Sequence, residues 1–448
     1  MPTKNRIQTA PPVGPLLWSL STLFLGVGLL LVGVGLLFSV LGLRAGVAQF
    51  SSITLGLVTS AYYAGFVGGT FACPILIRKV GHIRAFAAMA SLASTMPILH
   101  ALWIDPWFWG VLRFITGVCM VGLYIVIESW LNALAPNALR GRLFAVYMAV
   151  NFVALALGQW LILVGDRLGF VPFAMVSVMF SFALLPITMT KVDEPAPVQA
   201  PKFSLRSLYD ASPLGMAAAV ASGLITGAFY GMGTVFGKAA GFSDAGVASF
   251  MAAAILGGAI FQWPVGIFSD RHDRRVVLLW VCVLGAGVTL LGFVLAHYAV
   301  DALLPLALVF GGLIFSMYGL GVAHVNDVID SSRLVEFTGG LLLLHGVGAA
   351  IGPVLAGTVM DVAGPSSLML FYAAVMGAMA LYTVKRLRYF PPVPAEQKAD
   401  FVAMGGGSQA VLQMDPRTLP EEGSSASLAA ADEGAARGQG GQGGQGGF

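Results

Sequence analysis

The sequence predicts an all-α integral membrane protein built as two bundles of six transmembrane helices each. Three observations lead to this prediction. Only 10% of the 448 residues are charged and 57% are hydrophobic, whereas a soluble domain carries roughly 25% charged residues. The chain also contains twelve long apolar runs, and two short basic loops lie 192 residues apart at the same place in two halves. Because so little charge is available to coat a surface in water, we expect lipid to be the solvent.

The twelve apolar runs each meet the length of about 20 residues that a membrane-spanning helix requires. In the first half they cover 16–43, 52–77, 83–103, 107–133, 142–165 and 170–190. In the second half they cover 213–237, 244–268, 275–298, 302–327, 337–360 and 366–385. We therefore expect an N-terminal tail (1–15), a first bundle (16–190), a polar, proline-containing linker (191–212), a second bundle (213–389) and a C-terminal tail (390–448).

The two ends of the chain are expected to lie outside the bundles. The first apolar run is too long for a signal-peptide core, so it is interpreted as the first membrane helix. Residues 390–448 are rich in Pro, Ala, Ser and Gly and end in GQGGQGGQGGF. We expect this tail to be disordered and assign it no transport chemistry. The three cysteines lie in apolar runs without metal-ligand spacing, so neither a disulfide nor a metal site is expected.

The distribution of Lys and Arg predicts the orientation in the membrane. With the N-terminus inside, the inner segments hold 17 Lys and Arg residues and the outer loops hold 3. Positive residues concentrate on the cytoplasmic side of membrane proteins. We therefore expect both termini and the linker in the cytoplasm, in a bacterial inner membrane. The net charge of +3 is too small to indicate a nucleic-acid partner.

The two basic loops carry a resemblance to a known family. They read PILIRKVGHIR (74–84) and GIFSDRHDRR (266–275), and Gly65 aligns with Gly257 at the same offset. The second loop resembles the signature between helices 8 and 9 of the major facilitator superfamily. In the first loop, Pro74 replaces its glycine and Arg78 its aspartate. Segments such as VTSAYYAGFVGG (58–69), IESWLN (127–132) and AHVND (323–327) resemble the YcaD-like branch of that superfamily, and the similarity extends over 16–388.

The resemblance implies a secondary transporter that moves a small organic molecule by alternating access, with one cavity between the two halves. We expect proton coupling, and the direction is open: efflux is one possibility, uptake of a metabolite or vitamin-like compound is the alternative, and a non-transporting membrane sensor is the second alternative. The sequence contains neither a phosphate-binding P-loop nor a zinc-protease motif, so we predict no enzyme and no cofactor. The expected partners are the lipid bilayer, a small molecule and H⁺, and the protein is expected to be a monomer.

Charged and polar residues inside the spans are the candidates for substrate binding or coupling. Arg113 lies in the fourth span, where the resemblance links an arginine to substrate or proton coupling; an arginine bonded to neighbouring carbonyls is the structural alternative. The resemblance also implies that the cavity wall comes from spans 1, 4, 7 and 10. Further candidates on these spans and their neighbours, for each of which helix packing is the alternative, are Tyr124, Tyr230, Tyr318, His324, Asn326, Gln159 and Gln262.

Two acidic residues are the candidates for an inner gate. Glu128 follows Arg113 by fifteen residues, a rise of about 22 Å, so the two cannot pair. We expect Glu128 to form an inner-gate ion pair, with proton carriage or a passive structural pair as alternatives. Its candidate partners are Arg78, Lys79, Arg84, Arg140 and Arg142.

Asp327 is expected to play the matching role in the second half. Its candidate partners are Arg271, Arg274 and Arg275, beside Gly266. The resemblance implies that Asp270 caps the helix of the eleventh span, where the positive helix end favours an anion. A solvated loop is the alternative for all of these charges.

Overall fold

The computed structural model describes residues 13–136, 139–166, 169–189, 195, 204–330 and 333–388, together with 398, 401, 402, 408 and 410. All other residues of the predicted linker and of the two predicted tails lie outside this described part. Twelve long helices are found in it, within five residues of the predicted bounds. In the first half they are α1 (Val13–Val47), α2 (Ser52–Val80), α3 (His82–Leu102), α4 (Pro106–Leu134), α5 (Arg140–Trp160) and α6 (Val171–Met189).

The second half repeats this order after a short helix in the linker, α7 (Leu205–Ala211). Its long helices are α8 (Pro213–Ala239), α9 (Asp244–Arg271), α10 (Arg274–Tyr298), α11 (Leu303–Asn326), α12 (Leu334–Ala363) and α13 (Ser367–Leu387). Among the described residues, eleven helices are long and apolar enough to cross a membrane, and α6 adds a shorter apolar helix over Val171–Pro186. The prediction of an all-α membrane protein is therefore confirmed.

The helix starts follow from capping residues in the short loops. The carboxylate of Asp105 accepts a hydrogen bond from the backbone N–H of Phe108 at 2.8 Å, and Pro106 occupies the first turn of α4. Ser51, Ser212 and Ser243 cap α2, α8 and α9 in the same way. These side chains satisfy backbone donors that have no partner inside the helix, so these four spans begin at defined residues.

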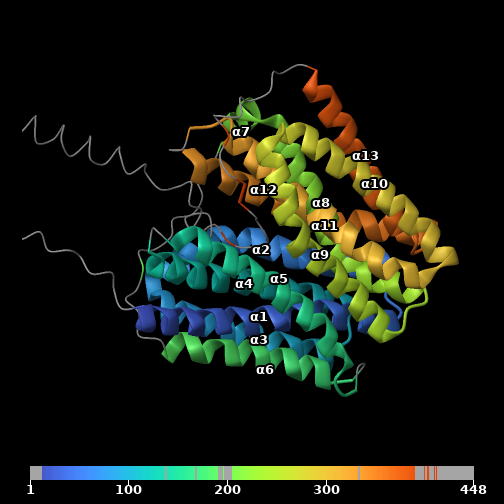
Figure 1. Ribbon diagram of the computed structural model, residues 1–448. Coiled ribbons are helices and arrows are strands. Elements are labelled where there is room, and N and C mark those ends of the chain that lie inside the picture. Colours follow the sequence, from blue (N-terminus) through green and yellow to red (C-terminus); the bar gives the residue numbers. More distant parts are fainter. Residues whose placement is uncertain are drawn as a thin grey trace, which may run out of the picture.

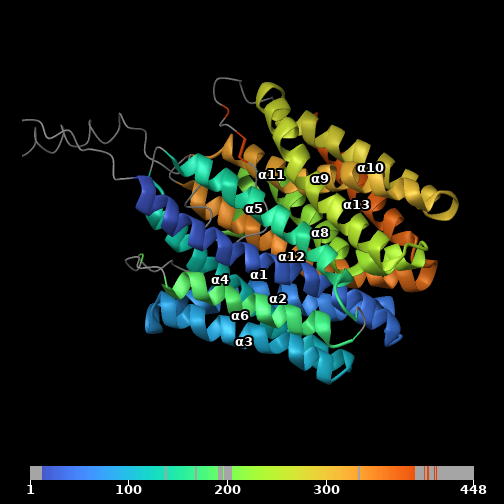
Figure 2. The same ribbon diagram turned by 60° about the horizontal axis from the view of Figure 1, so that its bottom comes forward.

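The helices form two bundles that diverge toward one end of the molecule (Figure 1). Helices α1–α6 form one bundle and α8–α13 the other, and Figure 2 shows the same division after rotation. The bundles meet mainly through α2 against α12, α5 against α9, and α8 against α1 and α2. We call the end that carries α7 and the start of α12 the tail end, and the end that carries Ser52 and Ala363 the opposite end.

At the opposite end the two bundles are in direct contact. The carboxylate of Asp361 in α12 accepts hydrogen bonds from the backbone N–H groups of Ser52 at 2.8 Å and Ile53 at 2.9 Å, at the start of α2. Gly56 and Gly357 lie against backbone atoms of the other helix, so that a β-carbon at either position would overlap them. This close approach, typical of small residues between membrane helices, closes the opposite end.

Candidate functional site

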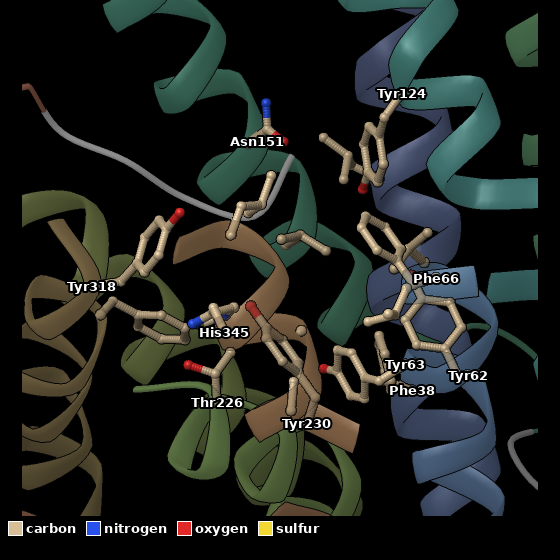
Figure 3. Close-up of a pocket in the computed structure, with 18 of the residues that line it drawn as sticks. Phe38, Tyr62, Tyr63, Phe66, Tyr124, Asn151, Thr226, Tyr230, Tyr318 and His345 are labelled. Atoms are coloured by element: carbon tan, nitrogen blue, oxygen red, sulfur yellow. The ribbon is translucent and has the colours of Figure 1, made fainter. Parts of the chain in front are cut away.

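A cavity lies between the two bundles and is lined by residues from both. Its volume is about 150 Å³, and seven helices contribute to it, namely α1, α2, α4, α5, α8, α11 and α12. Figure 3 shows Tyr318 and His345 on one side, opposite Phe66 and Tyr124 on the other. The wall therefore includes α2, α5 and α12 in addition to the four helices that were predicted. The lining residues are Leu31, Val34, Phe38, Tyr62, Tyr63, Phe66, Val67, Thr70, Tyr124, Asn151, Phe152, Leu155, Thr226, Tyr230, Ile314, Phe315, Tyr318, Leu342, Leu343, His345, Gly346 and Ala349.

Aromatic rings dominate this lining and contact one another. The ring of Tyr230 lies 5.1 Å from that of Phe38 and 6.1 Å from that of Phe315. The rings of Tyr62 and Tyr63 meet edge to face at 5.1 Å. These spacings suit attractive aromatic pairs. A flat ring that enters the cavity would find both faces and edges to pack against.

A few polar atoms are available in this apolar wall. The hydroxyl of Tyr318 is buried and has no hydrogen-bond partner among the described residues. His345 hydrogen bonds through Nδ1 to the hydroxyl of Ser222 at 2.9 Å, and its ring lies 4.8 Å from the ring of Tyr318. Asn151 donates its side-chain amide to the carbonyl of Tyr147 at 2.7 Å. Such groups can orient a ligand through one or two hydrogen bonds, while the rings supply the contact area.

The described lining contains no Asp, Glu, Lys or Arg. A charged ligand would therefore lose its hydration without gaining an opposite charge, which costs several kcal/mol. A cavity of this volume matches the size that takes up a single benzene ring. The site is thus suited to small uncharged aromatic compounds. Nor does the described part of the chain contain a cluster of three side chains that could hold a metal ion.

Arg113 lies behind this aromatic wall rather than in it. Its guanidinium stacks 4.7 Å from the ring centre of Phe38 and 4.2 Å from that of Tyr62. The side chain is buried, and its Nη2 has no hydrogen-bond partner in the described structure. Cation–π contact of this kind stabilises a desolvated arginine. Arg113 therefore reaches the cavity only through the two rings that it supports.

A cluster of ion pairs lies at the tail end of the second bundle. Arg274 donates to the carboxylate of Asp327 at 2.7 Å, and both side chains are almost completely buried. Arg274 also pairs with Asp270 at 3.1 Å and donates to the hydroxyl of Ser269. The structure thus pairs Asp327 with one of its three predicted partners, while Arg271 is exposed.

The neighbouring pair in this cluster joins Arg275 to Asp273. Two guanidinium nitrogens of Arg275 donate to the carboxylate, at 2.6 Å and 3.0 Å. Partial burial alone would raise the pKa of Asp273, but hydrogen bonds from the side chain and backbone of Arg275 outweigh it and lower the pKa below 3.8. Asp273 is therefore ionised at neutral pH, and it also caps α10.

Asp270 lies elsewhere than predicted. Within the described structure it pairs with Arg274 and accepts a hydrogen bond from the backbone N–H of Phe401 at 2.9 Å. It makes no described contact with the start of α12, where the resemblance implied a helix cap. The start of α12 carries its own acid, since Glu336 pairs with Arg333 at 3.3 Å. The attraction of Arg274 therefore holds Asp270, in the last turn of α9, against the start of α10.

Glu128 is completely buried near the tail end of α4. Its carboxylate accepts a hydrogen bond from the hydroxyl of Tyr147 in α5 at 2.7 Å, and bonds from the backbone N–H and the hydroxyl of Ser408. Tyr124 and Asn151, one turn from Glu128 and Tyr147 respectively, line the cavity. Residues four apart share a helix face. Glu128 and Tyr147 thus form a hydrogen-bonded polar pair between the cavity and the tail end.

The predicted basic partners of Glu128 divide into two groups. Arg78, Lys79, Arg84 and Arg142 are exposed, and only Arg140 is partly buried. The ion-pair role predicted for these five residues stays a prediction. The hydroxyl of Tyr147 was not anticipated because a tyrosine in an apolar run gives no sign of an acid partner nineteen residues away.

Several predicted binding residues lie away from the cavity. The buried amide of Gln159 bonds to Ser39 and to the carbonyl of Gly35, so it joins α5 to α1. Gln262 donates to the carbonyl of Phe315, and Asn326 accepts from Thr338. His324 lines a different cavity of about 300 Å³ at the tail end, beside Asp273 and Arg275. Of the predicted binding residues, Tyr124, Tyr230 and Tyr318 are those that line the central cavity.

Comparison with known families identifies this architecture. The family described as Major Facilitator Superfamily matches residues 23–332 and 214–413, which together cover most of the chain. The chain belongs to the major facilitator superfamily. Its class is therefore that of a secondary transporter in a membrane, and it is not an enzyme.

Curated relatives agree with this assignment. An uncharacterised MFS-type transporter of Enterobacter sp. (strain 638) is 28% identical over 348 residues, which cover 75% of this chain and 87% of that protein. The uncharacterised MFS-type transporter YcaD of Salmonella arizonae (strain ATCC BAA-731 / CDC346-86 / RSK2980) is 27% identical over 371 residues, 81% and 93% of the two chains. The predicted resemblance to the YcaD-like branch is thus confirmed.

Solved structures show the same fold at low sequence identity. The nucleoside transporter NupG is 16% identical with a TM-score of 0.67, over 83% of this chain and 100% of that chain. A bacterial homologue of the human lysosomal transporter Spinster, in its inward-facing and occupied conformation, is 13% identical with a TM-score of 0.68, over 87% and 99%. Both are similar to this superfamily member in architecture.

Proposed function

We propose that this transporter is a proton-coupled exporter of small uncharged aromatic compounds, acting as a monomer in a bacterial inner membrane with its tail end in the cytoplasm. The observation that carries the proposal is the chargeless aromatic cavity. Residues from both bundles of one chain form its wall. Rocking of the bundles would therefore expose the same site to each side in turn.

Export is the direction that best suits such a cargo. Uncharged aromatic compounds enter lipid readily because their transfer from water to hydrocarbon is favourable. A cell gains little from a pump that imports what already diffuses inward, whereas expulsion requires one. Uptake of a compound with several hydroxyl groups is the alternative, and Tyr318, Asn151 and Thr226 would then supply its hydrogen bonds.

Glu128 is the residue that we assign to proton coupling. A carboxylate inside a membrane span is costly and marks proton pathways in transporters. Glu128 is buried and lies one helical turn from Tyr124 in the cavity wall. Protonation would remove its charge and weaken its bonds with Tyr147, and so would link the arrangement of α4 and α5 to the proton gradient.

The test is transport in proteoliposomes with an imposed pH gradient, in both gradient directions. The cargo panel consists of neutral one-ring and two-ring aromatic compounds, each with a carboxylate and a quaternary ammonium analogue. We expect gradient-driven flux of a neutral compound, at least roughly tenfold faster than that of its charged analogues, a difference of about 1.4 kcal/mol. Equal flux of charged and neutral analogues would rule out the cargo class, and flux driven by the reverse gradient would establish uptake.

Glu128→Gln tests the coupling separately from the cargo. The neutral amide keeps the shape of the side chain but cannot exchange a proton. We expect it to abolish accumulation against a gradient and to leave equilibrium binding of the cargo within about threefold. The matched control is Glu336→Gln, since Glu336 is only partly buried and pairs with the exposed Arg333. If Glu128→Gln still concentrates the cargo, Glu128 is not the coupling residue.

A further inference from the structure

Part of the C-terminal tail is bound inside the protein. Ser408 is 1% exposed and Ala410 is fully buried. The backbone N–H of Ser408 lies 3.0 Å and 3.2 Å from the two carboxylate oxygens of Glu128, and its hydroxyl also donates to that carboxylate. The hydroxyl in turn accepts a bond from the N–H of Ala410 at 3.1 Å. A surface tail would not be expected to supply three bonds to a buried acid.

A second part of the tail is anchored on the other bundle. The ring of Phe401 lies directly against Gly266, where any β-carbon would overlap it, and its N–H donates to Asp270. The ammonium group of Lys398 donates to the carbonyl of His272 at 2.7 Å. These contacts lie on the last turns of α9 and at His272, which follows it directly. The described tail residues therefore contact both α9 and α4.

The two ends of the molecule are thus joined in different ways. At the opposite end α2 and α12 touch directly, through Asp361 and closely packed glycines. At the tail end the described pieces of residues 398–410 lie between the diverging bundles (Figure 1). Alternating access requires the tail ends to approach each other when the opposite end opens. The side chain of Phe401 and the buried Ser408 occupy space that this approach needs.

We propose that the C-terminal tail acts as an internal ligand, which binds α4 through Ser408 and the end of α9 through Lys398 and Phe401, and which holds the transporter open at its tail end. Glu128 and Asp270 are carboxylate acceptors for the tail, the carbonyl of His272 is a further acceptor, and the ring of Phe401 packs against Gly266. The bound segment stabilises one of two conformations, so its release shifts the population toward the other. This inference does not depend on the cargo or on the coupling ion.

The experiment measures the distance between the two bundles at the tail end, without any cargo. Spin labels at Ile83→Cys and Arg388→Cys, both exposed, report it in the full-length protein after the three buried cysteines are replaced by Ala. Ser408→Pro removes both the N–H and the hydroxyl that bind Glu128. We expect the ratio of short to long distances to rise by roughly tenfold, equivalent to about 1.4 kcal/mol.

Two further samples make the result decisive. Ser427→Pro introduces the same exchange nineteen residues later in the tail, and we expect it to leave the distances unchanged. A synthetic peptide of residues 398–410, KADFVAMGGGSQA, added to the Ser408→Pro protein should restore the long distances. The proposal is overturned if Ser408→Pro and a second variant, Phe401→Asp, both give the distances of the parent protein, or if Ser427→Pro has an equal effect.

Discussion

The turn between α9 and α10 and the turn between α2 and α3 occupy equivalent places in the two halves, but their charges are arranged differently. In the second half, Arg274 and Arg275 are buried and bonded to Asp327 and Asp273. In the first half, Arg78 and Lys79 are exposed. The nearby buried acid there, Glu128, accepts bonds from Tyr147 and from the tail residue Ser408.

The two halves therefore differ in where the partners of their buried acids come from. The pairs in the second half all lie within one bundle: Arg274 in α10 pairs with Asp270 and Asp327, and Asp273 and Arg275 both lie at the start of α10. They can therefore persist while the bundles rock. The bonds of Ser408 reach Glu128 across 280 positions of sequence, from a segment that is not part of either bundle. The second loop thus joins helices of its own half, whereas the acid of the first half would change partners only on the proposed release of the tail.

The largest expected effect comes from breaking the buried pair of the second half. Asp327→Asn leaves the buried guanidinium of Arg274 with Asp270 as its remaining described acid. Removal of one partner from a buried ion pair costs about 3–5 kcal/mol. We expect a loss in that range in the free energy of unfolding, measured by denaturation in detergent. In the control Glu336→Gln, which breaks an exposed pair, the loss should stay below about 1 kcal/mol. Equal losses in the free energy of unfolding of the two variants would mean that the ion pair of Asp327 with Arg274 does not stabilise the second half.

A smaller effect is expected from the corresponding change in the first half. Tyr147→Phe removes the hydroxyl that donates to Glu128 and keeps the buried ring. Loss of a hydrogen bond to a charged acceptor costs about 1.5–3 kcal/mol. The tail bonds to Glu128 remain, so we expect a value near the lower limit. Double-mutant analysis with Ser408→Pro would show whether the two donors act on one acid, since independent donors would give strictly additive losses.

The helices and the second loop could be predicted from sequence because both depend on patterns that can be read along the chain. Twelve apolar runs of sufficient length allow few alternatives in lipid. The pairing of Asp327 with the arginines near 274 was anticipated because aligned repeats bring the ends of adjacent helices together. The length of an apolar run and the offset of a repeat are visible without knowledge of side-chain packing.

The cavity wall and the partners of Glu128 could be predicted only in part. Gln159 and Tyr124 both carry a polar group within an apolar span. Gln159 hydrogen bonds to the carbonyl of Gly35 in α1, whereas Tyr124 faces the cavity. The rotation of each helix about its axis decides whether a side chain contacts a neighbouring helix or faces the cavity. Because membrane helices have low amphipathicity, the sequence gives little indication of this rotation. The contact of Ser408 with Glu128 depends on a polar tail, whose composition suggests disorder.

A pH effect of modest size should distinguish the second loop from the first. The pKa of Asp273 is lowered by Arg275, so its pair stabilises the folded protein fully above the ordinary carboxyl value of 3.8. The contribution is lost as the pH falls through the lowered pKa. We expect Asp273→Asn to destabilise the protein by about 1 kcal/mol or less at pH 6. The difference from the parent protein should shrink below pH 4, as measured by unfolding at several pH values. A constant difference at every pH would contradict the ionic role of Asp273.

The smallest effect is expected from giving the first loop the acid that it lacks. Arg78→Asp places a carboxylate where the second loop has Asp270, at a position that is exposed in this conformation. Because an exposed substitution of this kind changes the free energy of unfolding by no more than about 0.5 kcal/mol, we expect unchanged stability in denaturation measurements. The matched substitution Arg142→Asp, also exposed, is the control. If Arg78→Asp alone raised the free energy of unfolding by more than about 1 kcal/mol, the first loop would be able to form ion pairs like those of the second. The difference between the two halves would then be due to the residue at position 78 rather than to the position of the tail.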